Sequence, residues 1–309
     1  MKFGFCVPNL TDGDDLKKFA VAVETLGFES IWWGDHLILP TASTNQYPYS
    51  TDGSYHRPLE EPFMEVLTVL THIAACTTTI KVGSTVIIVP YRNPVLQAKI
   101  FASMDVLSKG RTVCGVGVGW LEKEFETLGV PYADRGPMTD EWLTIFKDLW
   151  TSDYPEHQGE FYQYDGIRFY PNPVQKPHIP IWVGGHSRRA IRRTIDYGDA
   201  WHPSRHTPEW LEQQLPYLRQ YAEEKNRDVD DITVSLKRAV HFNDIGIDEG
   251  QNQAALGTIV GSTSEIIDDI KLCQEIGVHQ LTYDFRTTNI DSCMKILEHF
   301  ANKVVPRIS

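Results

Sequence analysis

The sequence predicts a (β/α)8 TIM barrel in which residues 1–309 form a single domain. A short apolar run, a loop and an amphipathic helix follow one another eight times along the chain, as parallel strands with covering helices require. A chain of this length can fold as one barrel instead of two domains, since barrels routinely exceed the usual ~150 residues per domain. A doubly wound open sheet is the competing fold, because a pattern specifies the order of strands but not their closure.

The first half of the chain supplies four strand–helix units. The second strand contains Trp32 and Trp33, whose side chains should alternate between the barrel interior and the helices. The third strand is rich in β-branched residues and leads to Asn93-Pro94, a cap and first-turn proline that open a helix. We expect these strands at 3–7, 30–33, 80–89 and 112–118, and their helices at 16–26, at 63–70, from 94 and at 139–150.

The second half supplies four further units with clear start and stop signals. Thr207-Pro208 opens one helix, Ser262 to Glu265 form a capping box for another, and Gly277 ends the latter. We expect these strands at 180–183, 199–202, 233–242 and 280–285, and their helices from 188, from 208, at 263–276 and at 290–304.

Two insertions do not follow the repeat. Residues 37–62 form a polar loop after the second strand, and residues 153–179 are aromatic and turn-rich, which suggests a short hairpin. Long loops in a compact barrel usually have a function, so both are candidate lids at the C-terminal face of the strands.

Charge and composition exclude several partners. A net charge of -12 disfavours nucleic acid and anionic membranes, and no apolar run approaches the ~20 residues of a membrane span. The N-terminus lacks the layout of a signal peptide. Five scattered cysteines without a C-x-x-C motif predict reduced thiols, no metal framework and a cytoplasmic location.

Candidate site residues lie where predicted strands end. Asp35 and His36 follow the second strand, where His36 either moves a proton or is a structural histidine under the next loop. Gly117, Gly119 and Trp120 lack dinucleotide spacing. They either let a flat ring or phosphate approach the backbone or form a tight barrel rim.

A second candidate site is the stretch Gly184-Gly185-His186-Ser187, which leads into a helix that begins with Arg188-Arg189. Free amides and the positive end of the helix dipole suit a phosphate, whereas the alternative is an ordinary capped helix start. The histidines at 202 and 206 lack a third ligand nearby, so no metal site is expected.

Two further charged positions remain open. Asp284 and Arg286 either bind a polar substrate or form an ion pair that closes the barrel. Lys237 would be the lysine of a barrel aldolase or isomerase that works without flavin.

Taken together, several motifs resemble the bacterial luciferase-like flavin oxidoreductases, a family of (β/α)8 barrels, over nearly the whole chain. The matching stretches are 29–36, 82–95, 107–111, 115–120, 124–125, 135–136, 181–185 and 261–265.

The resemblance implies roles for these positions. A non-prolyl cis peptide at Thr85-Val86 would lie behind the central ring of the cofactor, and His36, beside Asp35, would be the active-site histidine. Its ring would be oriented by Asp35 or by a backbone carbonyl. The remaining implied cofactor-binding residues are Gly117, Gly119, Trp120, Gly184, Gly185, His186 and Ser187.

The resemblance implies hydride transfer between coenzyme F420, the preferred cofactor, and a small organic substrate. The alternatives are an FMN-dependent monooxygenase or a non-catalytic flavin-binding barrel. Val118 and Trp120 replace an arginine of luciferase subunits and a glutamate of F420-dependent sugar-phosphate dehydrogenases, so neither light emission nor that oxidation is implied. Family members are commonly dimers, which makes a homodimer the assembly to expect.

Overall fold

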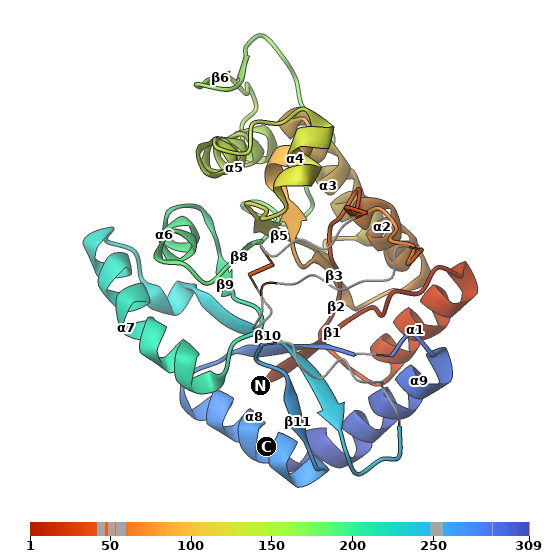
Figure 1. The fold of residues 1–309 in the computed structure, drawn as a ribbon. Coiled ribbons are helices and arrows are strands. Elements are labelled where there is room, and N and C mark those ends of the chain that lie inside the picture. Colours follow the sequence, from red (N-terminus) through yellow and green to blue (C-terminus); the bar gives the residue numbers. More distant parts are fainter. Residues whose placement is uncertain (42–46, 49–52, 54–59, 248–255, 286, 309) are drawn as a thin grey trace.

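A computed structural model describes residues 1–308 except 42–46, 49–52, 54–59, 248–255 and 286. Eight parallel strands form a closed barrel, which confirms the predicted fold (Figure 1). The pairings β1–β12 and β9–β10 complete the ring. The barrel strands are β1 (Lys2–Cys6), β2 (Ser30–Trp33), β3 (Lys81–Ser84), β5 (Thr112–Gly117), β8 (Ile181–Gly184), β9 (Ala200–His202), β10 (Thr233–Phe242) and β12 (Gln280–Asp284).

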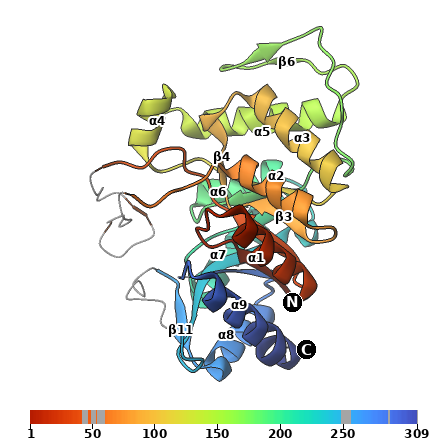
Figure 2. The same ribbon diagram turned by 90° about the vertical axis from the view of Figure 1, so that its right-hand side faces the viewer.

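Helices surround the strands, as the two ribbon views show (Figures 1 and 2). The predicted start signals at Asn93, Thr207 and Ser262 all act as N-caps, and Ser262 with Glu265 forms the expected capping box. The helices are α1 (Gly13–Thr25), α2 (Val66–Cys76), α3 (Pro94–Ser108), α4 (Glu122–Leu128), α5 (Arg135–Thr151), α6 (Arg188–Tyr197), α7 (Pro208–Glu224), α8 (Thr263–Glu275) and α9 (Ile290–His299). In the described part of the chain, none combines the length and apolar character that a bilayer span requires.

The third predicted strand is interrupted. β3 ends at Ser84, a cis peptide joins Thr85 to Val86, and the chain continues as β4 (Ile87–Ile88) and a 3-10 turn (Val89–Tyr91). A β-branched run predicts extended backbone but carries no signal for such a bulge. The family resemblance placed a cis peptide at Thr85-Val86, and the structure has it there.

Two elements escaped the sequence analysis. Helix α4 and strand β11 (Ile259–Gly261) have seven and three residues, which is too short for a periodic pattern to stand out.

The two adjacent tryptophans alternate as predicted. Trp32 is fully buried inside the barrel, where its indole donates to Ser30 Oγ at 2.8 Å and lies against Gly83. A Cβ on Gly83 would fall 2.4 Å from the Trp32 ring, so the neighbouring strand β3 needs glycine there. Trp33 faces the helices and donates to the Met64 carbonyl at 3.1 Å.

The insertion 153–179 contains the expected hairpin, β6 (His157–Gln158) with β7 (Gln163–Tyr164), but it is no lid. Glu141 on α5 accepts from the amides of residues 160–162, and Asp105 on α3 accepts from Val174 and Gln175. The segment therefore covers the outer sides of α3 and α5 (Figure 2). It follows a helix and so leaves the barrel from the N-terminal ends of the strands. The other insertion, 37–62, lies largely outside the described residues.

One buried cation ties several elements together. The Arg111 guanidinium donates to the carbonyls of Ala74, Thr77, Ile80 and Ser108, at 2.8 to 3.0 Å. It also donates to the Thr77 hydroxyl at 3.0 Å. These acceptors end α2 and α3 and precede β3, so a single side chain satisfies carbonyls that helix ends leave without partners.

Replacement of Arg111 with methionine should lower the free energy of unfolding by about 3 kcal/mol or more, because several buried carbonyls lose their donors at once. Urea denaturation measures this, with Arg189→Met, at an exposed position, as the matched control. Equal stability of the two variants would show that water replaces the guanidinium without cost.

Candidate active site

The loop after β2 carries two charged residues with separate partners. Asp35 is buried, and its carboxylate accepts two hydrogen bonds from Arg92, at 2.8 and 2.9 Å, and one from the Ile88 amide at 2.9 Å. Arg92 also donates to Glu65 at 2.8 Å. Asp35 therefore anchors the loop to the segment that follows β4.

His36 is held by a residue to which the sequence analysis gave no role. Its Nδ1 lies 3.0 Å from the carboxylate of Glu124, at the start of α4. The orienting role given to Asp35 or a backbone carbonyl falls instead to Glu124. Glu124-Phe125 is one of the motifs that resemble the family, so the sequence did mark Glu124. Its contact with His36 could not be predicted, because 88 positions separate the two residues.

The Glu124 carboxylate is fully buried and accepts several hydrogen bonds. Besides His36, it accepts from the Leu37 amide at 2.5 Å, the Ile38 amide at 3.2 Å and the Tyr91 hydroxyl at 2.8 Å. Burial alone would raise the pKa of Glu124, but these hydrogen bonds and the charge of His36 hold that pKa below its ordinary value. Burial and the neighbouring Glu124 carboxylate in turn raise the pKa of Tyr91.

Aromatic rings flank the His36 imidazole. Phe63 and Trp120 meet it edge-on, with ring centroids 5.6 and 6.3 Å away. Tyr47 packs against Trp120 at 5.0 Å. The structure thus brings Trp120 to His36, whereas Gly117 and Gly119 have other neighbours.

The side chain of Val86, in the bulge, explains two predicted glycines. A Cβ on Gly117 would fall 2.5 Å from Val86 Cγ2, and a Cβ on Gly184 would fall 2.8 Å from Val86 Cγ1. A third, Gly119, has φ of +81° and borders Ile88 and Phe125. These glycines thus make room for neighbouring side chains of the protein, which is the rim-packing alternative for Gly117 and Gly119.

Thr85 is held from inside the barrel. Its hydroxyl hydrogen-bonds His202 Nε2 at 3.1 Å, and His202 Nδ1 hydrogen-bonds Ser235 at 2.9 Å. The imidazole also stacks on Trp32, with centroids 5.1 Å apart. Burial and the nearby Lys237 lower the pKa of His202 to about 3, so this histidine is neutral. His206 stacks instead on Trp210 at 3.7 Å, so the two histidines do not converge on a metal.

The predicted phosphate turn lies between β8 and α6. Gly185 has φ of +103°, a left-handed conformation that favours glycine, and its carbonyl accepts from the Trp201 indole at 3.0 Å. Ser187 caps α6 by accepting from the Ala190 amide at 3.2 Å. The first amides of a helix have no intrahelical acceptor, and Ser187 is exposed, so the turn fits a phosphate group. Arg188 lies over the ring of Tyr217 at 4.8 Å.

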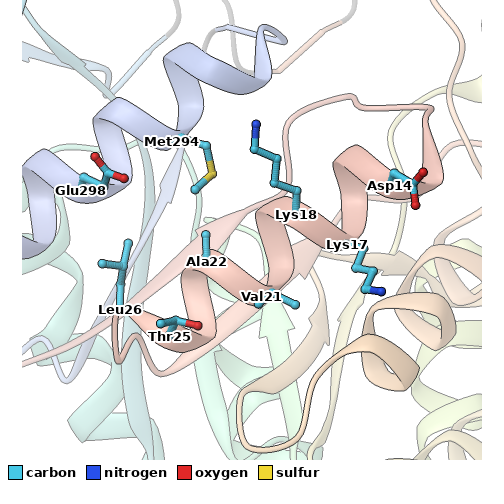
Figure 3. Close-up of a pocket in the computed structure, with 9 residues that line it drawn as sticks. All are labelled: Asp14, Lys17, Lys18, Val21, Ala22, Thr25, Leu26, Met294 and Glu298. Atoms are coloured by element: carbon cyan, nitrogen blue, oxygen red, sulfur yellow. The ribbon is translucent and has the colours of Figure 1, made fainter.

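An apolar hollow elsewhere has a different character. Figure 3 shows it between α1 and α9, where Val21, Ala22 and Met294 line it and Lys18 and Glu298 stand at its edge. It lies between two outer helices, away from His36 and the bulge, and no candidate site residue lines it.

Comparisons with known proteins show what the chain is similar to. The model of a family described as luciferase-like monooxygenase matches residues 1–245. An uncharacterized protein of Mycobacterium tuberculosis is 33% identical over 100% of both chains. An FMNH(2)-dependent dimethylsulfone monooxygenase of Pseudomonas putida is 27% identical over 71% of this chain and 60% of that protein.

Two further similarities involve F420. An F420-dependent glucose-6-phosphate dehydrogenase of Amycolatopsis mediterranei is 26% identical over 72% of this chain and 64% of that protein. Among solved structures, an F420-dependent secondary alcohol dehydrogenase superposes with a TM-score of 0.79. It shares 17% identity and covers 100% of this chain and 99% of its own, which shows a shared fold.

Glu124→Gln should make stability less dependent on pH. Because the pKa of Glu124 is lowered in the folded protein, its stabilisation is present above the ordinary value of 4.5 and is lost as the pH falls through the folded value. The variant should lose about 1–3 kcal/mol at pH 7, and its deficit should shrink below pH 4.5.

Urea titrations at several pH values measure this effect, with the exposed Glu122→Gln in the same helix as control. A deficit that is the same at every pH would contradict the assigned role of the Glu124 charge.

Proposed function

The chain belongs to the luciferase-like monooxygenase family of oxidoreductases, and on that premise we propose that it transfers a hydride between coenzyme F420 and a small organic substrate. The observation that carries the proposal is the pairing of His36 with the buried Glu124, beside a cis-peptide bulge at the C-terminal ends of the strands. That is where barrel enzymes build their active sites.

The choice of F420 rests on similarity and on the motifs around His36. The Trp-Gly-Asp-His run, the Gly-Gly turn and the Gly-Val-Gly-Trp segment resemble the F420-dependent branch, and an F420-dependent dehydrogenase is among the relatives. The dimethylsulfone monooxygenase among the relatives supports FMN as the alternative.

Bound at this site, the cofactor would supply or accept the hydride. His36 would hold the accompanying proton. Because Nδ1 of His36 points at Glu124, the opposite nitrogen, Nε2, is the one to exchange a proton with the substrate. The Glu124 carboxylate would stabilise the imidazolium form and hold the ring in one orientation.

We assign the cofactor contacts to two regions. The turn Gly184-Gly185-His186-Ser187 would bind phosphate through its amides. Thr85 and Val86 would back the reactive ring, with Gly117, Gly119 and Trp120 along its edge. Trp120 and Phe63 would also shield the His36 ring from water. We further expect a cytoplasmic homodimer, as in other members of the family.

Absorption titration of the purified protein with F420 and with FMN tests the cofactor proposal. We expect a saturable spectral change with F420 and a weaker one with FMN. Tighter binding of FMN would favour the monooxygenase. No binding of either would eliminate the flavin-type function and leave the Lys237 aldolase or isomerase.

His36→Ala should leave F420 affinity nearly intact and lower turnover by about 10²–10⁴-fold, because a positioned acid–base is lost. Glu124→Gln should lower turnover less, since the imidazole remains but is held less firmly. Stopped-flow measurement of F420 absorbance gives both values, with His178→Ala, a histidine bound to its own segment, as control. Full activity of His36→Ala would support the non-catalytic barrel.

A further inference from the structure

A second group of ionisable side chains lies at the C-terminal ends of β1 and β12 and in the middle of β10. Cys6, Lys237 and Asp284 come from inward-facing positions of these strands, and Arg205 follows β9. In the strand register Phe5 pairs with Tyr283 and Ala239 with Asp284, so Cys6 is level with Asp284 and Lys237 lies two residues before that level on β10. We call Cys6, Arg205, Lys237 and Asp284 the Lys237 cluster.

Backbone bonds fix the cluster in place. The Arg205 amide donates to the Lys237 carbonyl at 2.8 Å, and the Lys237 amide donates to the Pro203 carbonyl at 2.9 Å. The Arg205 guanidinium then reaches Asp284 at 3.7 Å. Asp284 thus forms an ion pair with Arg205, while the two alternatives predicted for Asp284 with Arg286 stay open. Arg286 lies outside the described residues.

The charged side chains of the cluster differ in their partners. Lys237 and Arg205 are cations, and Asp284 is the anion. Cys6 is a neutral thiol, because burial raises its pKa to about 12 even though Lys237 hydrogen-bonds it. Among the described residues, no carboxylate forms an ion pair with Lys237. Lys237 therefore brings a positive charge without an ion-paired carboxylate into the barrel of a chain whose net charge is -12.

The cluster adjoins the proposed reaction site. Lys237 is close enough to His202 to lower its pKa, and His202 hydrogen-bonds Thr85 of the bulge at 3.1 Å. His202 Nδ1 hydrogen-bonds Ser235, which lies two positions before Lys237 on β10, so Lys237 and the bulge are both near the same imidazole. If the acidic group of a small molecule bound at Lys237, the rest of that molecule would lie near the cofactor ring proposed to contact Val86.

We propose that the Lys237 cluster binds an acidic group of the substrate, so that the substrate is an organic anion, a carboxylate or a phosphate ester. This assignment of substrate class rests on the proposed function for its role in the reaction. A partly buried ammonium without a counter-ion is costly, and a ligand anion would supply charge-assisted hydrogen bonds to it. A neutral molecule of the same shape would leave that charge unpaired.

Calorimetric titration of the cofactor-free protein with benzoate, phenyl phosphate and benzamide tests the proposal. At least one of the two anions should bind about tenfold or more tightly than benzamide. The better of the two identifies the acidic group. Lys237→Gln should abolish the preference, and Lys81→Gln, which removes the same charge at the other end of the barrel, should keep it.

Asp284→Asn provides a change of opposite sign, since it removes the anion of the cluster and should strengthen anion binding several-fold. If Lys237→Gln does not fold, Asp284→Asn still tests whether the cluster binds an anion. Equal binding of all three probes, an anion preference that survives Lys237→Gln, or weaker anion binding by Asp284→Asn would overturn the proposal. Because no cofactor is present, this outcome is independent of the F420 titration: cofactor binding without anion preference leaves hydride transfer with a neutral substrate.

Discussion

The Glu124 carboxylate is the point on which the geometry of the site depends. It collects hydrogen bonds from the imidazole of His36, from two amides of the loop after β2 and from Tyr91 at the end of the bulge segment. Two chain segments are therefore tied to α4 through one buried charge. Asp35, the residue before His36, also accepts hydrogen bonds from the bulge segment, from the Arg92 side chain and the Ile88 amide. The result is a histidine whose ring is fixed although it lies in a loop.

Local patterns were enough to predict most of the barrel. Strand β10 has the predicted bounds, Thr233–Phe242, and the caps at Asn93 and Ser262 start helices where expected, because these signals depend on neighbouring residues. The partner of His36 could not be predicted in this way, since the contact joins distant segments and depends on α4, a helix too short to detect. The same reason explains why Asp35, adjacent in sequence, was given the role of Glu124.

The acidic character of the chain takes on a more specific meaning. A negatively charged protein repels anions on average. Where an anionic ligand binds, local groups must overcome that field at short range. We propose two such places, the helix start at Ser187 and the Lys237 cluster, and they belong to different strands. A phosphate-bearing cofactor and an acidic substrate would then occupy separate positive sites without competing for one.

The contact of Val86 with Gly117 and Gly184 limits how the proposed cofactor site could be redesigned. The three positions belong to three different segments, yet they share one volume, so they behave as a single unit in any mutant library. In a library that varies only one of the two glycines, almost every new side chain would overlap the side chain of Val86. A library that shortens Val86 together with a change at Gly117 or Gly184 would change the shape of the proposed site, and it would reach substrate shapes that single substitutions cannot.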